Sequence, residues 1–218
     1  MHPSSQRIQG LYHGNLSAFG DVIQPLLEAL GTELSYVKEM DWIQSLQYFS
    51  GGKALEQTYP YDEHETYYAT NIMTHVLSDV QISSLMSTLF AHGSADPSPN
   101  WSYILELPGG NESAVTQVDP SATAFFHRDK PLLHQFSVGD PGTRVIDDGI
   151  ALINEFRKRV IDLMGNAEWG MYANYVDTEL GPNEAQHMYW GGNLPRLQRL
   201  KAQLDPKQVF WNPHGIRP

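Results

Sequence analysis

The amino-acid sequence predicts an α+β fold in which an antiparallel sheet is flanked by helices. Three stretches repeat apolar residues at helical spacing, and short aromatic or β-branched runs lie between them. Helices and strands come in mixed order, and several strands alternate apolar with polar residues, which favours a sheet covered on one face. We expect a lobe over residues 1–180 and a terminal segment over residues 181–218 that packs back on the core or on a partner.

The expected helices span residues 16–31, 78–93 and about 143–163. In the first, Ser17 is the predicted N-cap, and Pro25 should kink the helix or mark a restart. A Ser-Asp-Val-Gln capping box opens the second. The expected strands are residues 66–76, 101–107, 122–126, 132–138 and 171–176.

Charge and composition exclude several classes of protein. The 218 residues include 14 Lys and Arg against 25 Asp and Glu, a net charge of −11 that disfavours nucleic-acid binding. Cysteine is absent, which excludes disulfides, thiolate metal sites and a cysteine nucleophile. No apolar stretch has transmembrane length, and no signal-peptide core follows Met1, so we expect a cytoplasmic protein without a membrane partner.

Several common catalytic motifs do not occur in the sequence. The nine histidines show no compact metal-ligand spacing, so we expect no metal site. The two Gly-Gly pairs belong to no phosphate-binding motif, and tight turns explain them. A Gly-x-Ser-x-Gly motif is also missing, so nothing favours a serine hydrolase.

The last fifty residues carry the most informative pattern. It reads Tyr-x-Asn-Tyr-x-Asp over residues 172–177, then Tyr-x-Gly-x-Asn-x-x-Arg-Leu over residues 189–197. Lys201, Asp205-Pro206 and Phe210 follow, and Asp205-Pro206 is expected to end the terminal helix. If residues 171–176 form a strand, Tyr172 and Tyr175 point to opposite sides of it.

These motifs resemble the C-terminal region of berberine-bridge-enzyme-like flavoprotein oxidases. Upstream, Tyr12-x-Gly14 and residues 38–42, 106–110 and 122–135 resemble the substrate lobe of the fungal carbohydrate-oxidase branch. The resemblance implies the substrate-binding lobe of vanillyl-alcohol-oxidase-type flavoproteins. In that family a separate N-terminal domain carries the flavin. We therefore expect no cofactor in this chain alone, and FAD if a flavin domain completes it.

The resemblance also implies roles for single residues. Tyr175 matches the general base of alcohol oxidation, and Glu106 matches a carboxylate close to that base. A tyrosine base requires neighbouring donors or cations that lower its pKa from about 10. The candidate substrate contacts are Gln135, Trp101, Tyr172 and Asn174, and Tyr189 and Asn193 are the candidate flavin contacts where flavin is present.

Three functions remain open on the sequence alone. The absence of a flavin-domain segment favours a redox-neutral biosynthetic enzyme that cyclises or isomerises a natural-product intermediate, or performs a cycloaddition, in secondary metabolism. The alternative is the C-terminal part of an FAD-dependent oxidase of alcohols, sugars or secondary metabolites, with Tyr175 as base. A second alternative is a non-catalytic binding protein.

Besides a small-molecule substrate, we expect a protein partner. The apolar residues expected to be exposed without a flavin domain are Trp190, Phe210, Trp211 and the tail near Ile216. They predict a homodimer or a complex with a flavin-domain partner.

Overall fold

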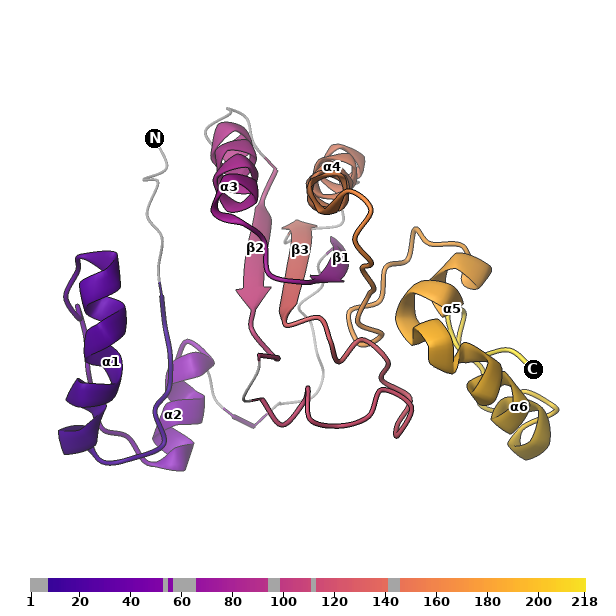
Figure 1. Cartoon of the computed structure of the whole chain (residues 1–218), viewed down its shortest axis with the longest axis horizontal. Coiled ribbons are helices and arrows are strands. Elements are labelled where there is room, and N and C mark those ends of the chain that lie inside the picture. The colour runs from indigo at the N-terminus through magenta and orange to yellow at the C-terminus, as the bar shows by residue number, and fades with distance from the viewer. Residues whose placement is uncertain (1–7, 53–54, 57–65, 94–98, 111–112, 141–145) are drawn as a thin grey trace. The chain divides into compact units, whose positions relative to one another are not determined.

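The computed structural model describes residues 8–52, 55–56, 66–93, 99–110, 113–140 and 146–218 (Figure 1). These residues form two compact units, one within residues 3–63 and one within residues 64–218. The boundary expected near residue 180 concerns the terminal segment and stays a prediction. In the part of the chain that the structure describes, no helix is long and apolar enough to cross a membrane.

The N-terminal unit contains two helices, α1 (Leu16–Leu30) and α2 (Trp42–Phe49). The expected Ser17 cap is wrong, because Asn15 is the N-cap and its side chain accepts a hydrogen bond from the Ala18 N–H at 2.9 Å. Ser17 instead donates its hydroxyl to Asn15, at 2.8 Å. The helix runs through Pro25 without a restart.

Helix α2 was not expected from the sequence. It begins at a capping box in which the Gln44 N–H donates to Asp41 Oδ1 at 2.8 Å and the Asp41 N–H donates to Gln44 Oε1 at 3.0 Å. Neither helix has a substantial buried face: α1 buries none of its residues, and α2 buries only Ser45. The apolar stripes of both helices are therefore open for packing against something else.

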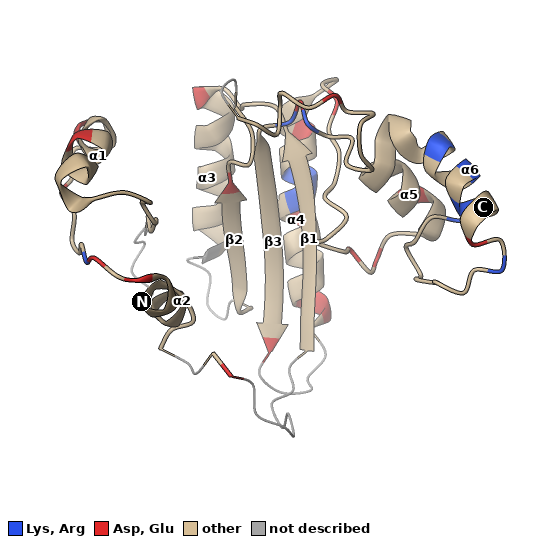
Figure 2. Ribbon diagram, turned by 90° about the horizontal axis from the view of Figure 1, so that it is seen from below, with Lys and Arg blue, Asp and Glu red and all other residues tan. Residues whose placement is uncertain are grey.

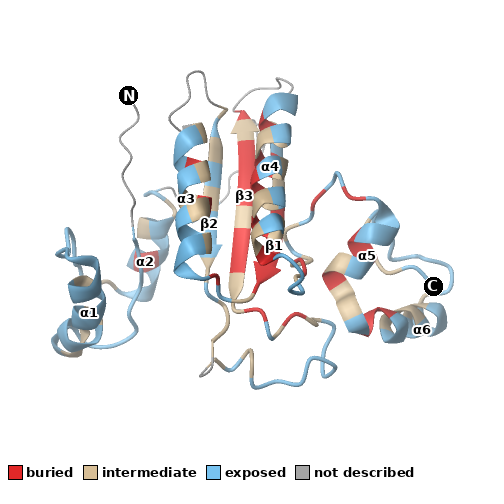
Figure 3. Cartoon of the chain, turned by 45° about the horizontal axis from the view of Figure 1, so that its top comes forward, coloured by how far each residue is buried: buried red, intermediate tan, exposed pale blue. Residues whose placement is uncertain are grey.

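The second unit is built on an antiparallel sheet, which confirms the α+β prediction (Figure 2). Its strands are β1 (Thr66–Thr74), β2 (Trp101–Glu106) and β3 (Leu132–Asp140), in the order β1-β3-β2. Helices α3 (Asp79–Gly93) and α4 (Asp147–Met164) lie behind the sheet in Figure 2. One face of the sheet is thus covered by helices, and β3 is the central, mostly buried strand (Figure 3).

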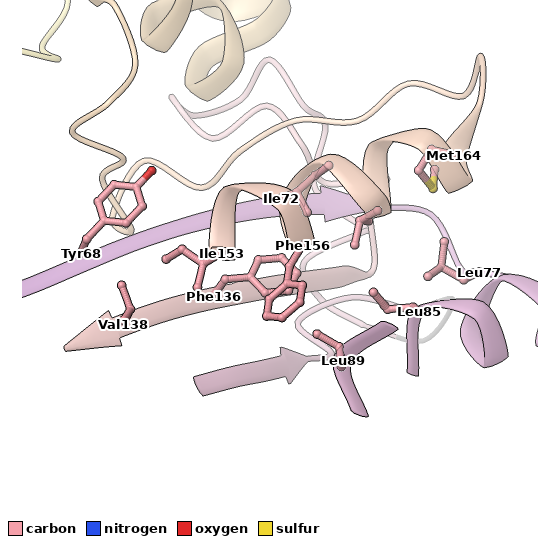
Figure 4. Packing of buried hydrophobic residues seen from close by; sticks show 11 residues of the cluster. Tyr68, Ile72, Leu77, Leu85, Leu89, Phe136, Val138, Ile153, Phe156 and Met164 are labelled. Carbon is pink, nitrogen blue, oxygen red and sulfur yellow. The ribbon is translucent and has the colours of Figure 1, made fainter. Parts of the chain in front are cut away.

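The core fills the space between the sheet and these two helices (Figure 4). Phe136 of β3 and Phe156 of α4 are completely buried, with their ring centroids 6.1 Å apart. Ile72 of β1 and Ile153 of α4 are also fully buried in this cluster. Each such side chain contributes roughly 1.5–3 kcal/mol when removed from water, so this layer holds the unit together.

The helix boundaries follow the expected signals. The predicted capping box of α3 is present, since the Ser78 N–H donates to Gln81 Oε1 at 2.8 Å and the Gln81 N–H donates to Ser78 Oγ at 3.4 Å. Helix α4 is assigned from Asp147, and residues 143–145 of the prediction lie outside the described residues.

The terminal segment is helical and belongs to the same unit. It consists of α5 (Pro182–Trp190), a short 3-10 turn η1 (Gly191–Asn193) and α6 (Leu194–Leu204). Asp205 caps α6, which confirms the predicted end of the terminal helix.

Two of the five predicted strands are wrong. Residues 122–126 form bends and irregular structure, in which Asn193 Nδ2 donates to the carbonyls of Thr123 and Ala124, at 3.1 and 3.4 Å. Residues 171–176 form a turn that is closed by a hydrogen bond from the Tyr175 N–H to the Tyr172 carbonyl at 3.1 Å. In both places backbone groups bond outside a strand ladder, to a distant side chain at residues 123–124 and within the turn at residues 172–175, so the aromatic composition does not lead to a strand.

Candidate functional site

The uncovered face of the sheet carries polar side chains from all three strands. Asn71 of β1 pairs in register with Gln135 of β3, and Gln135 pairs with Ile104 of β2. Glu106 is two residues beyond Ile104, so its side chain lies on the same face. Because the strands alternate, this face is opposite to the one that packs against α3 and α4.

Tyr175 and Glu106 meet on this face. The Tyr175 hydroxyl donates a hydrogen bond to Glu106 Oε1 at 2.9 Å, and both residues are half-buried. This bond, burial and the charge of Glu106 raise the pKa of Tyr175, with smaller contributions from Tyr172 and Tyr67. The shift is opposite to the lowering that a free tyrosine base requires, because a carboxylate favours the protonated phenol. The pair therefore holds its proton on Tyr175.

The turn at residues 172–175 determines where the two tyrosines lie. Their ring centroids are 5.4 Å apart in an edge-to-face arrangement, so the expectation that they point to opposite sides is wrong. Asn174 Nδ2 donates to the Tyr172 hydroxyl at 2.7 Å, and Phe125 packs edge-to-face on Tyr172 at 5.9 Å. The result is an aromatic wall beside the Tyr175 hydroxyl.

Asn71 fastens this turn to the sheet. Its side chain is completely buried and makes three hydrogen bonds to the turn backbone. Nδ2 donates to the carbonyls of Tyr175 at 2.7 Å and Tyr172 at 3.2 Å, and Oδ1 accepts from the Tyr172 N–H at 2.7 Å. Sequence reasoning missed Asn71, and also Tyr67, because only the strand register reveals which β1 side chains share this face.

Trp101 is not brought to this site. Its ring packs on Phe156 at 5.0 Å, on the helix-covered face of the sheet. Gln135, in contrast, lies on the same face as Glu106 and is partly exposed. The structure therefore brings together Tyr175, Glu106, Tyr172, Asn174 and Gln135, and separates Trp101 from them.

The two candidate flavin contacts have partners within the chain. The Tyr189 hydroxyl is buried and accepts a hydrogen bond from the Asp177 N–H at 2.9 Å. Asn193 Nδ2 also reaches the Pro120 carbonyl, at 2.7 Å. Their role toward a flavin stays a prediction, and their visible role is to tie the terminal helices to neighbouring loops.

Asp177, two residues after Tyr175, is a buried anchor for the segment. Its carboxylate accepts hydrogen bonds from the Tyr68 and Thr70 hydroxyls, both at 2.7 Å, and pairs with Arg157 Nη1 at 3.0 Å. The carboxylate also accepts from the Glu179 N–H at 2.9 Å. A fully buried carboxylate is tolerated because this set of donors replaces water.

The residues of the site fit one side of a flat redox cofactor. The hydroxyl–carboxylate pair can move a proton, and the tyrosine rings offer apolar surface next to it. Binding the phosphates of a dinucleotide requires several N–H donors or cations, and of Tyr175, Glu106 and Gln135 only Gln135 carries N–H donors. Among the described residues, no group of three or more His, Asp or Glu side chains could hold a metal ion.

Comparison with known proteins establishes the family. Residues 171–217 match the family model described as "Berberine and berberine like". The xylooligosaccharide oxidase of Thermothelomyces thermophilus is 35% identical over 97% of this chain and 43% of the relative. The chain belongs to the berberine-bridge-enzyme-like family. The FAD-linked oxidoreductase dpmaF of Metarhizium anisopliae is also 35% identical, over 96% of this chain and 42% of the relative.

Solved structures of the family agree with this assignment. The xylooligosaccharide oxidase from Myceliophthora thermophila C1 in complex with xylobiose matches with a TM-score of 0.83 and 34% identity, over 95% of this chain and 44% of that one. The chain thus spans less than half the length of the family members it matches, and it corresponds to their C-terminal part.

The comparisons correct the functional expectation. A redox-neutral cyclase or isomerase of secondary metabolism is wrong as the main interpretation, because four relatives that are 30–35% identical are named oxidases of oligosaccharides or carbohydrates. They favour the alternative, the C-terminal part of an FAD-dependent oxidase. The family includes enzymes that are named as FAD-linked.

Proposed function

We propose that this chain forms the substrate side of an FAD-dependent oxidase that oxidises a hydroxyl group of a saccharide. The observation that carries the proposal is the 2.9 Å hydrogen bond between Tyr175 and Glu106 on the open face of the sheet. Support for the substrate class comes from relatives that are 30–35% identical over 96–97% of the chain and are named oligosaccharide or carbohydrate oxidases.

The chain's own residues handle the proton in this reaction. Oxidation of an alcohol to a carbonyl removes a hydride from carbon and a proton from oxygen. FAD, when bound, supplies the two-electron acceptor for the hydride. Tyr175 passes its proton to Glu106 Oε1 while its oxygen takes the proton of the substrate hydroxyl, so the phenol is neutral before and after the step. The raised pKa of Tyr175 is compatible with such a relay.

Neighbouring side chains orient the substrate. Gln135 lies on the same sheet face as Glu106 and carries an amide that can bond to a sugar hydroxyl. The rings of Tyr172 and Phe125 offer apolar surface for the C–H face of a sugar ring. Orientation by both kinds of contact would place one hydroxyl against Tyr175.

A chimaera tests the proposal. This chain would replace the corresponding 43% of the Thermothelomyces xylooligosaccharide oxidase. We expect the flavin absorbance of the anaerobic protein to bleach when an oligosaccharide is added. Tyr175→Phe should slow this bleaching by roughly 10²–10⁴-fold at unchanged flavin content, because it removes the proton acceptor and keeps the ring.

Tyr172→Phe, from the same turn, is the matched control. It removes a hydroxyl that bonds only to Asn174 in the described contacts, so it should act mainly on KM. Tight oligosaccharide binding without bleaching would contradict the oxidase proposal and favour a binding protein.

We also infer that the chain packs on a protein partner. Phe210 is 84% exposed, Trp211 is 65% exposed, and Leu204 at the end of α6 is 81% exposed. Of the other two residues expected there, Trp190 and Ile216 are only partly exposed. Several large exposed apolar residues within one short stretch, residues 204–211, favour a contact surface for a partner.

A further inference from the structure

We infer that Asn71 is a positioning residue that holds the Tyr175 hydroxyl against Glu106. The inference rests on the proposed function only for the role of this contact in proton transfer. Its physical basis is the set of bonds between one buried amide of β1 and the turn that carries the tyrosine.

The Asn71 amide forms hydrogen bonds with both ends of the turn. It receives the Tyr172 N–H at 2.7 Å and donates to the Tyr175 carbonyl at 2.7 Å, with a longer bond to the Tyr172 carbonyl at 3.2 Å. Both polar atoms of the side chain are therefore used, and the Asn71 side chain itself is completely buried. The first and last residues of the turn are thus fixed relative to β1.

The position of the Tyr175 hydroxyl depends on these hydrogen bonds. Residues 172–175 do not pair with β1 as a strand, and the last backbone pairing with β1 before the turn is the isolated bridge between Met73 and Gly170. Glu106 lies on β2, at the other edge of the three-stranded sheet. Asn71 therefore determines how far the Tyr175 hydroxyl extends across the sheet toward Glu106. Its register places it on the open face and on the strand to which the turn is bonded.

Asn71 can be separated from the buried polar residues that serve stability alone. Thr74, also on β1 and completely buried, points to the helix-covered face and bonds to His134 and to the His75 carbonyl. Replacing either Asn71 or Thr74 removes buried hydrogen bonds of β1, so both substitutions should lower the free energy of unfolding. Only the loss of Asn71 should change the surroundings of the Tyr175 hydroxyl.

The test reads the ionisation of Tyr175 directly in the 218-residue chain. A 3,5-difluorotyrosine introduced in place of Tyr175 alone gives one fluorine resonance, and its titration lies nearer to neutral pH than that of tyrosine. In Asn71→Ala we expect the pKa of this residue to fall toward the value in Glu106→Gln, because the bond to Glu106 is loosened. Thr74→Ala should leave the titration unchanged.

An unchanged titration in a folded Asn71→Ala chain would overturn the inference, and so would an equal shift in Thr74→Ala. If Asn71→Ala does not fold, Asn71→Ser retains one short donor and should give a smaller shift in the same direction. The outcome is independent of the oxidase proposal: a chimaera that oxidises no saccharide would refute that proposal and leave the position of Tyr175 as measured. In an active chimaera, Asn71→Ala should lower kcat by about 100-fold with little change in KM.

Discussion

At the scale of single residues, the hydrogen bonds of His134 determine which of its ring nitrogens carries the proton. It is completely buried, with the Tyr103 hydroxyl 2.9 Å from Nδ1 and the Thr74 hydroxyl 3.0 Å from Nε2. Thr74 already donates its hydrogen to the His75 carbonyl, so Nε2 must be the donor to Thr74. Nδ1 then accepts from Tyr103, and the ring is neutral.

This environment predicts a pH dependence of stability. Burial lowers the pKa of His134 from 6.5 to about 4, so the unfolded chain binds more protons than the folded chain between these values. The free energy of unfolding should therefore fall as the pH is lowered from 6.5 to 4, by up to roughly 3 kcal/mol. Urea unfolding at pH 7 and pH 4.5 measures the loss.

His134→Asn provides the comparison. It removes the titrating ring but leaves His127, whose pKa is also lowered by burial, so the difference between the two pH profiles isolates His134. Parallel profiles for the wild type and His134→Asn would show that the burial of His134 does not cause the pH dependence.

The residues of the site were predictable to different degrees. Tyr175 and Glu106 follow from the family resemblance, and the structure brings them together. Trp101 is five residues before Glu106 on one strand, and an odd separation puts the two side chains on opposite faces. Strand alternation alone therefore argued against Trp101. Asn71 could not be found in this way, because its role depends on pairing between distant strands.

At the scale of elements, the contact between α4 and β3 depends on a glycine. A Cβ atom at Gly149 would lie 2.5 Å from Cγ2 of Val138, which is buried in the core. Replacing a helical glycine by alanine gains about 1 kcal/mol of helix propensity. Overpacking a tight core costs typically about 1–3 kcal/mol, so the steric cost outweighs the gain.

We therefore expect Gly149→Ala to lower the free energy of unfolding by about 1 kcal/mol, measured by urea unfolding. Gly20→Ala in α1 is the matched control, because nothing lies within 4 Å of its added Cβ. That variant should increase the helicity of α1, which far-UV circular dichroism measures. A more stable Gly149→Ala protein would mean that α4 can move away from β3.

The elements themselves were predictable where side-chain spacing controls the backbone. In α1, α3 and α4 the apolar residues recur at helical spacing and form one face of each helix, so the sequence pattern and the observed helices agree. Helix α2 has only eight residues, too few for a period to stand out, and its capping box at Asp41 and Gln44 was the usable signal. The prediction of a strand at residues 122–126 failed because the carbonyls of Thr123 and Ala124 accept hydrogen bonds from the distant side chain of Asn193.

At the scale of the whole molecule, the exposed apolar residues predict association. Light scattering at micromolar concentration should give the mass of a dimer, or of a complex when a flavin-binding segment is supplied. The double variant Phe210→Ser with Trp211→Ser should shift the mass to that of a monomer. Val80→Ser, which changes a residue that is 80% exposed on α3, should not. A monomeric wild type that binds no flavin-binding segment would contradict the proposed partner.

The separation of Tyr175 and Glu106 along the chain has a consequence for biosynthesis. The two residues are 69 positions apart, and β1 can pair only after β3 has been synthesised. Contacts between such distant positions form slowly, because the entropy of closing a long loop is lost before the contacts can stabilise the fold. We therefore expect the tyrosine to meet its carboxylate late in folding. A nascent chain that does not yet contain residue 175 cannot form this bond, so the presence of the bond reports that the whole sheet has been synthesised.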